Sequence, residues 1–84
     1  MDSQGAEASR ELGAQPLDRV LLELGLSGRD LVRASTEQLT HKMVAKARRG
    51  RRVTANVQGK ILNALNRVRP RDPPFRLDEL FAYH

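Results

Sequence analysis

Apolar residues recur at helical spacing over most of the chain, beginning between residues 17 and 24. Leucine and valine occupy positions i, i+3, i+4 and i+7 there, namely Leu17, Val20, Leu21 and Leu24. This spacing is typical of one face of an amphipathic helix. Proline suits the first turn of a helix, and glycine suits the position after its last turn. Pro16 and Gly25 therefore predict the two ends of this helix.

A second helix is predicted by the signals at its N-terminus. Ser27 and Asp30 have the spacing of a capping box, in which each side chain bonds the backbone N–H of the other residue. Leu26 and Leu31 occupy the positions that a hydrophobic staple requires. The helix should be short, because polar residues interrupt the pattern from Ser35 onward.

Two starts compete for a third helix. Ser35 and Gln38 form a second possible capping box, which predicts a helix over residues 36–49. Thr40 is an alternative cap, which predicts a helix over residues 41–49. We favour the earlier start. In either case the helix should end at the glycine that follows it.

The longest stripe predicts a fourth helix over residues 55–67. Its apolar side consists of Val57, Ile61, Leu62, Leu65 and Val68. An extended link should follow, because prolines stand at Pro70, Pro73 and Pro74. No stretch alternates apolar and polar residues with period two, so no strand is expected. The predicted fold class is all-α, a small bundle of four to five helices.

The pattern divides the 84 residues into three parts. Residues 1–14 form a polar, net acidic arm, residues 15–69 a helical domain, and residues 70–84 a Pro-rich link with an aromatic tail. The tail carries an apolar patch made of Phe75, Leu77, Leu80 and Phe81. This patch could fold back over a thin core, or it could contact a second copy or a partner protein.

Charge is distributed unevenly along the chain. Residues 38–71 contain ten Lys and Arg and no Asp or Glu, whereas residues 1–37 hold four cations and seven anions. Residues 72–84 hold one cation and three anions, and the net charge of the whole chain is +5. Like charges gathered on a small domain repel one another, so this concentration predicts a polyanionic partner.

A helical projection of the third helix separates its two sides at about 100° per residue. The inward side consists of Leu39, Thr40, Met43, Val44 and Ala47. The outward side consists of His41, Lys42, Ala45, Arg48 and Arg49, with Lys46 at its flank. A donor-rich face with a small residue at its centre fits the major groove of duplex DNA, which admits one α-helix. We therefore predict a recognition helix, although a solubilising surface is the alternative.

Further residues are candidates for contacts with phosphates. Arg51 and Arg52 follow the third helix in an exposed loop, and cations at such a position fix the register of a protein on DNA. Ser27 and Thr36 stand at predicted helix N-termini, which bind anions. Capping alone is an equal interpretation for Ser27.

The stretches "LDRVLLELGLSGRDLVRAS" and "LTHKMVAKARRGRRVTANVQGKILNAL" resemble the lambda repressor-like (Cro/CI, XRE-type) helix-turn-helix family over residues 17 to about 66. The resemblance implies that the third helix enters the major groove and that dimers bind half-sites about one DNA turn apart. It also implies base contacts by His41 and Lys42, with Ala45 and Lys46 beside them, and backbone contacts near 49–52. The chain differs from the family at Arg48, where an acid is often found.

Other chemistries find little support in the sequence. There is no cysteine, and the two histidines, His41 and His84, share no triad, paired-carboxylate or metal-ligand spacing. No enzyme activity, metal or cofactor is therefore expected. No apolar run reaches the length of a membrane span, and the start lacks a secretory pattern, so a cytoplasmic protein is expected, nucleoid-associated if bacterial.

The sequence thus predicts sequence-specific binding of double-stranded DNA by a transcriptional regulator. Two other functions stay open, a protein-interaction adaptor that docks through its basic face and a binder of structured RNA. Binding of single strands is disfavoured because the aromatic residues that would stack on bases are separated from the cations.

Overall fold

The structure is a computed structural model that describes residues 15–82 of the chain. The predicted arm and the last two residues lie outside this range. The described part contains the helices α2 (Pro16–Leu24), α3 (Gly28–Ala34), α4 (His41–Arg48), α5 (Ala55–Val68) and α6 (Leu77–Leu80). It contains no strand. The prediction of a small all-α bundle is confirmed.

Glycine ends two of the helices as the sequence predicts. Gly25 follows α2 with φ +70°, and its N–H and that of Leu26 bond back to the carbonyls of the last turn at 3.1 and 2.9 Å. Gly50 follows α4 with φ +92°, and the N–H of Arg51 reaches the Lys46 carbonyl at 3.2 Å. Both are Schellman motifs, in which a left-handed residue turns the chain sharply away from the helix axis.

Helix α4 begins later than the favoured interpretation, because Thr40 and not Ser35 caps it. The Thr40 hydroxyl accepts a hydrogen bond from the Met43 backbone N–H at 3.1 Å. The Ser35 hydroxyl instead accepts from the N–H of Glu37, only two residues away, at 3.0 Å. Such a local turn offers the backbone an alternative to a helix. Residues 35–40 therefore form a connection, and the earlier of the two predicted starts is wrong.

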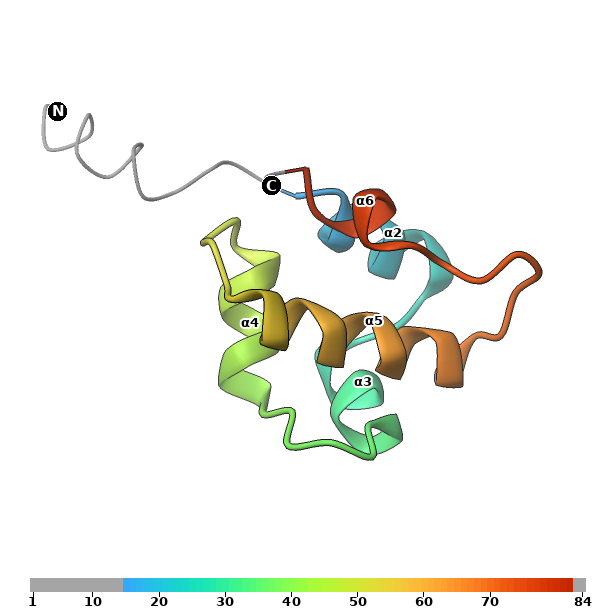
Figure 1. The fold of residues 1–84 in the computed structure, drawn as a ribbon, viewed down its shortest axis with the longest axis horizontal. Helices are drawn as coiled ribbons and strands as arrows, with labels where there is room; N and C mark the ends of the chain where they lie inside the picture. The colour runs from blue at the N-terminus through green and yellow to red at the C-terminus, as the bar shows by residue number, and fades with distance from the viewer. Residues whose placement is uncertain (1–14, 83–84) are drawn as a thin grey trace, which may run out of the picture.

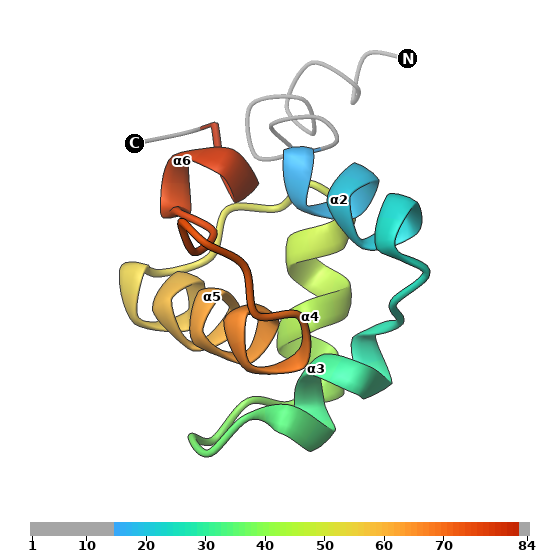
Figure 2. The ribbon, with the colours of Figure 1, turned by 90° about the vertical axis from the view of Figure 1, so that its right-hand side faces the viewer.

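The core lies where α5 crosses the other helices. In both views α4 stands upright, with α3 at its lower end and α2 and α6 near its upper end (Figures 1 and 2). Each helix contributes to the fully buried large side chains, which are Leu17, Leu21, Leu31, Val44, Ile61, Leu65, Leu80 and Phe81. A single apolar cluster thus fixes the orientation of α4 relative to the rest of the bundle.

The C-terminal segment closes this core. Phe75, Leu80 and Phe81 are buried, and only Leu77 of the predicted apolar patch stays partly exposed, at 37%. Of the two alternatives for this patch, folding back over the core is therefore correct. The other is wrong for these three side chains, because a residue inside the core offers no surface to a second copy or a partner.

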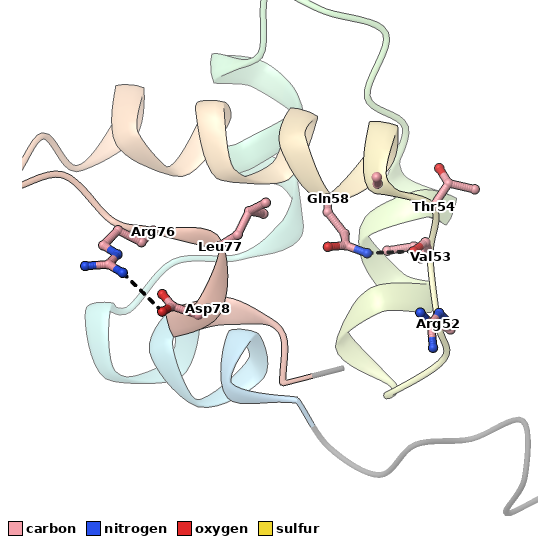
Figure 3. Close-up of a pocket in the computed structure, with 8 residues that line it drawn as sticks. Arg52, Val53, Thr54, Gln58, Arg76, Leu77 and Asp78 are labelled. Atoms are coloured by element: carbon pink, nitrogen blue, oxygen red, sulfur yellow. Dashed lines mark hydrogen bonds and ion pairs between the residues drawn. The ribbon is translucent and has the colours of Figure 1, made fainter. Parts of the chain in front are cut away.

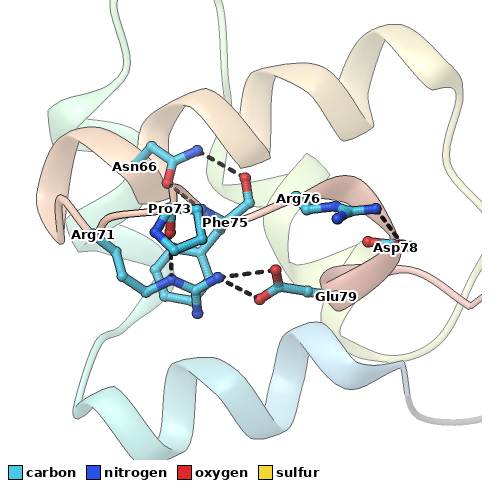
Figure 4. Close-up of polar contacts among 7 residues, drawn as sticks. All are labelled: Asn66, Arg71, Pro73, Phe75, Arg76, Asp78 and Glu79. Atoms are coloured by element: carbon cyan, nitrogen blue, oxygen red, sulfur yellow. Dashed lines mark hydrogen bonds and ion pairs between the residues drawn. The ribbon is translucent and has the colours of Figure 1, made fainter.

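Polar contacts fasten the segment to α5 (Figure 4). The Asn66 side chain donates to the Phe75 carbonyl at 3.2 Å and accepts from the Phe75 N–H at 2.8 Å. The Arg71 guanidinium lies 3.9 Å from the centre of the Phe75 ring and donates to both carboxylate oxygens of Glu79 at 2.8 and 2.9 Å. Since these contacts join α5, the link and α6, the segment after residue 69 is part of the folded unit.

Candidate nucleic-acid interface

Helix α4 presents a continuous polar and basic face to solvent. Its inner side is held by Val44, which is 1% exposed, and by the fully buried Ala47. The residues of α4 and its C-cap that are exposed are His41, Lys42, Ala45, Lys46 and Arg49. The sequence predicted His41, Lys42, Ala45 and Arg49 for the outward side and Lys46 for its flank. At the centre of the face lies alanine, so long side chains surround a point where the helix backbone can closely approach another surface.

Charge repulsion within this face has a measurable cost. Lys42 and Lys46 are separated by four residues, and Arg49 follows Lys46 by three, so neighbouring cations occupy adjacent turns of one helix. Like charges at these spacings destabilise a helix by about 0.2–0.5 kcal/mol per pair. The cations near the C-terminus of α4 recover part of this cost from the helix dipole. An anionic ligand would remove the rest.

Arg48 does not belong to this open face. Its Nε donates to the Asp18 carboxylate of α2 at 2.7 Å, and the two side chains are only 24% and 34% exposed. Arg48 stands at the edge of α4 nearest to α2, where the helical projection alone assigned it to the outward side. The prediction that Arg48 lies on the open side of the helix is therefore wrong, whereas its role as a DNA contact stays a prediction.

The loop after α4 carries the two further arginines. Arg51 is half-buried and Arg52 is exposed, and both make intramolecular interactions. The buried side chain of Gln58 in α5 holds this loop by donating from Nε2 to the Val53 carbonyl at 2.9 Å (Figure 3). Because the Schellman turn fixes one end and Gln58 the other, the loop keeps a set position beside α4.

An open cleft of about 550 Å³ lies between this loop and α6 (Figure 3). Its lining comes from Arg52, Val53, Thr54, Ala55, Gln58, Arg76, Leu77 and Asp78. Arg76 pairs with Asp78 at 3.3 Å across two exposed side chains, an arrangement that contributes little to stability. Its lining residues place the cleft between the basic loop on one side and residues 76–78 of the C-terminal segment on the other.

Neither Ser27 nor Thr36, the two residues predicted to bind phosphate at helix N-termini, forms an open anion site. The Ser27 hydroxyl accepts from the Asp30 N–H at 3.3 Å, and the Asp30 carboxylate accepts from the Ser27 N–H at 2.8 Å. Hydrogen bonds from the Ser27 backbone and then its hydroxyl hold the pKa of the Asp30 carboxyl below its usual value of 3.8. A phosphate would compete with this carboxylate, so Ser27 is a cap. Thr36 lies in the connection before α4, and its predicted place at a helix N-terminus is wrong.

Several cations of the acid-free segment serve the fold itself. Arg67 and Arg69 donate to the carbonyls of Ala34 and Leu24, the last residues of α3 and α2, at 3.0 Å each. Cations are favourable at these helix C-termini. Lys60 likewise donates to a backbone carbonyl of the 35–40 connection at 3.0 Å. These partners are distant in sequence, so neither spacing nor composition could reveal them.

Within residues 15–82, no group of three or more His, Cys, Asp or Glu could hold a metal ion. None of the described helices is both long and apolar enough to cross a bilayer. Comparisons with protein-family models, with curated proteins and with solved structures find no match to the chain.

Proposed function

We propose that the chain binds double-stranded DNA by laying α4 into the major groove, and that it acts as a sequence-specific transcriptional regulator. The observation that carries the proposal is the exposed face of α4, which combines four donor side chains with a central alanine and holds no acid. The major groove presents acceptors at guanine N7 and O6 to Lys and Arg, and it is wide enough for one helix.

Different residues of the face have different tasks in this proposal. His41 and Lys42 lie at the N-terminal end of α4, the end that contacts base edges in helix-turn-helix proteins. Lys46 and Arg49 follow on the same face, and Arg52 extends it into the fixed loop. Phosphate contacts by the last residues would set the register, while the first residues would read the sequence.

The assignment to the lambda repressor-like family is part of the proposal. Helices α3 and α4 have the order that a helix-turn-helix requires, with the N-terminus of α4 following a connection from α3. That connection covers residues 35–40, and its length is set by the Ser35 turn and the Thr40 cap.

Mapping of amide shifts tests where DNA binds. The ¹⁵N-labelled chain is titrated with a mixed-sequence DNA duplex at several salt concentrations, and an RNA duplex serves as competitor. We expect salt-sensitive binding with the largest shifts in α4 and residues 49–54, and weaker competition by RNA, whose major groove excludes a helix. Shifts confined to other elements, or RNA binding as tight as DNA binding, would contradict the proposal.

Two substitutions separate base from phosphate contacts. Lys42→Ala should change the ranking of sequences recovered in a binding-site selection. Arg52→Ala should weaken all duplexes alike and flatten the dependence of log K on log salt by about one. Arg76→Ala removes the same charge from the C-terminal segment and is the control. An unchanged ranking for Lys42→Ala would show that α4 does not read bases.

A further inference from the structure

An ion pair between Asp18 and Arg48 joins the proposed interface to α2. Asp18 lies in the first turn of α2, and Arg48 lies in the last turn of α4, 30 residues later. The distance of 2.7 Å from Nε to the carboxylate oxygen is that of a charge-assisted hydrogen bond. Because both side chains are largely withdrawn from solvent, salt screens this pair less than it screens the exposed cations.

The pair lies at the border of the basic face. Arg49, the next residue, is exposed on that face, and Lys46 is two residues before Arg48. Lys46, Arg48 and Arg49 share the last turn of α4 and its C-cap, so a phosphate bound by Lys46 and Arg49 would lie at the same end of the helix as Arg48. A carboxylate and a phosphate oxygen offer a guanidinium the same kind of acceptor. The two anions would therefore compete for Arg48.

We propose that the Asp18 carboxylate occupies the Arg48 guanidinium in place of a DNA phosphate. In this way it lowers the affinity of the α4 face for any duplex. This inference rests on the proposed function and adds a regulating residue outside the interface. Asp18 contacts no nucleic acid in this scheme. It acts through Arg48, by removing one cation from the set available to a phosphate backbone.

The exchange has a consequence for salt dependence. Binding constants fall as salt rises, and each phosphate that a protein neutralises makes the negative slope of log K against log salt steeper by about 0.9. Freeing Arg48 should add one such contact. At about 0.1 M salt this corresponds to roughly an eightfold gain in affinity for mixed-sequence DNA.

The test compares variants of matched charge by fluorescence anisotropy on a labelled mixed-sequence duplex over a salt series. Asp18→Asn removes the competing carboxylate, and Glu23→Gln removes one negative charge from an exposed position of the same helix. We expect the slope to steepen by about 0.9 for Asp18→Asn only. The double variant Asp18→Asn with Arg48→Gln keeps the net charge of the chain and should return to the original slope.

Equal gains for Asp18→Asn and Glu23→Gln would overturn the inference, since the effect would then be one of net charge. A gain that persists in the double variant would overturn it as well. Asp18 lies in the first turn of α2, where the helix dipole favours an acid, so its replacement could destabilise the helix. Circular dichroism is therefore used to verify that each variant folds.

A second pair of substitutions leaves Asp18 in place should its replacement prevent folding. Arg49→Gln should make the slope of log K against log salt shallower by about 0.9. Arg48→Gln should leave the slope unchanged, because the Asp18 carboxylate already occupies Arg48. Equal losses would refute the role of Asp18. Absence of salt-dependent binding by the unaltered chain would reject the proposed function together with this inference, whereas normal binding with no difference among the variants would reject this inference alone.

Discussion

Replacement of Phe81 by alanine tests whether the C-terminal segment completes the core. Phe81 has the largest of the fully buried side chains, and it stands directly after α6. Truncation of a buried phenylalanine costs about 3–5 kcal/mol, because apolar contacts are lost and a cavity remains. A chain of 84 residues has a total free energy of unfolding of roughly 4–13 kcal/mol. The substitution should therefore remove a large share of the stability.

The free energy of unfolding is measured by urea denaturation monitored by far-UV circular dichroism, with Leu77→Ala as the matched control. Leu77 is the first residue of α6, which Phe81 follows, but Leu77 is 37% exposed, so its truncation should cost about 1 kcal/mol or less. A loss for Phe81→Ala that is no larger than the loss for Leu77→Ala would refute the placement of this segment in the core. An unchanged m-value in both variants would support a simple loss of stability.

Three further expectations follow from single contacts. Thr40→Ala removes the cap of α4 and should cost about 1 kcal/mol, with faster amide exchange in α4; unchanged exchange there would contradict the capping role. The lowered pKa of Asp30 stabilises the fold above the usual value of 3.8, and this contribution is lost as the pH falls through the lowered pKa. Unfolding measured from neutral to acidic pH should therefore show a stability difference between Asp30→Asn and the unaltered chain that shrinks in acid, and a constant difference would argue against the shift. Gln58→Leu removes the hydrogen bond from the Gln58 side chain to the Val53 carbonyl and should cost about 0.5–1.5 kcal/mol in thermal unfolding, with an unchanged midpoint as the contrary result.

Signals that act over a few residues predicted most helix boundaries. The glycines after α2 and α4 have left-handed φ angles, and the Ser27–Asp30 capping box is present. These features depend on backbone geometry within one turn, so the residue type is nearly sufficient. The start of α4 was mispredicted because Ser35 and Thr40 both have capping chemistry. In the structure the Ser35 hydroxyl accepts from the Glu37 N–H, and the Thr40 hydroxyl accepts from the Met43 N–H. Residue type alone does not decide between a local turn and a helix cap, since serine and threonine form both.

The exposed side of α4 also followed from the sequence, since helical periodicity alone separates Lys42 from Val44. What the sequence could not provide is the use of each cation. Arg48 and Arg49 are adjacent in an acid-free segment, yet the first is paired with α2 and the second faces solvent. The partners of Arg67 and Arg69 are more than thirty residues away. Only tertiary structure can distinguish cations that tie helices together from cations that remain for a ligand.

The hydrogen bond from the Ala82 N–H to the Gln15 side chain, at 2.8 Å, brings the first and last described residues together. A fusion partner attached before position 15 would thus be tethered at almost the same point as one attached after position 82. A short peptide bridge there should permit a circular permutant opened elsewhere, for example in the 35–40 connection. Such a permutant would keep each helix described within residues 15–82, with α4 following the new N-terminus and α3 preceding the new C-terminus.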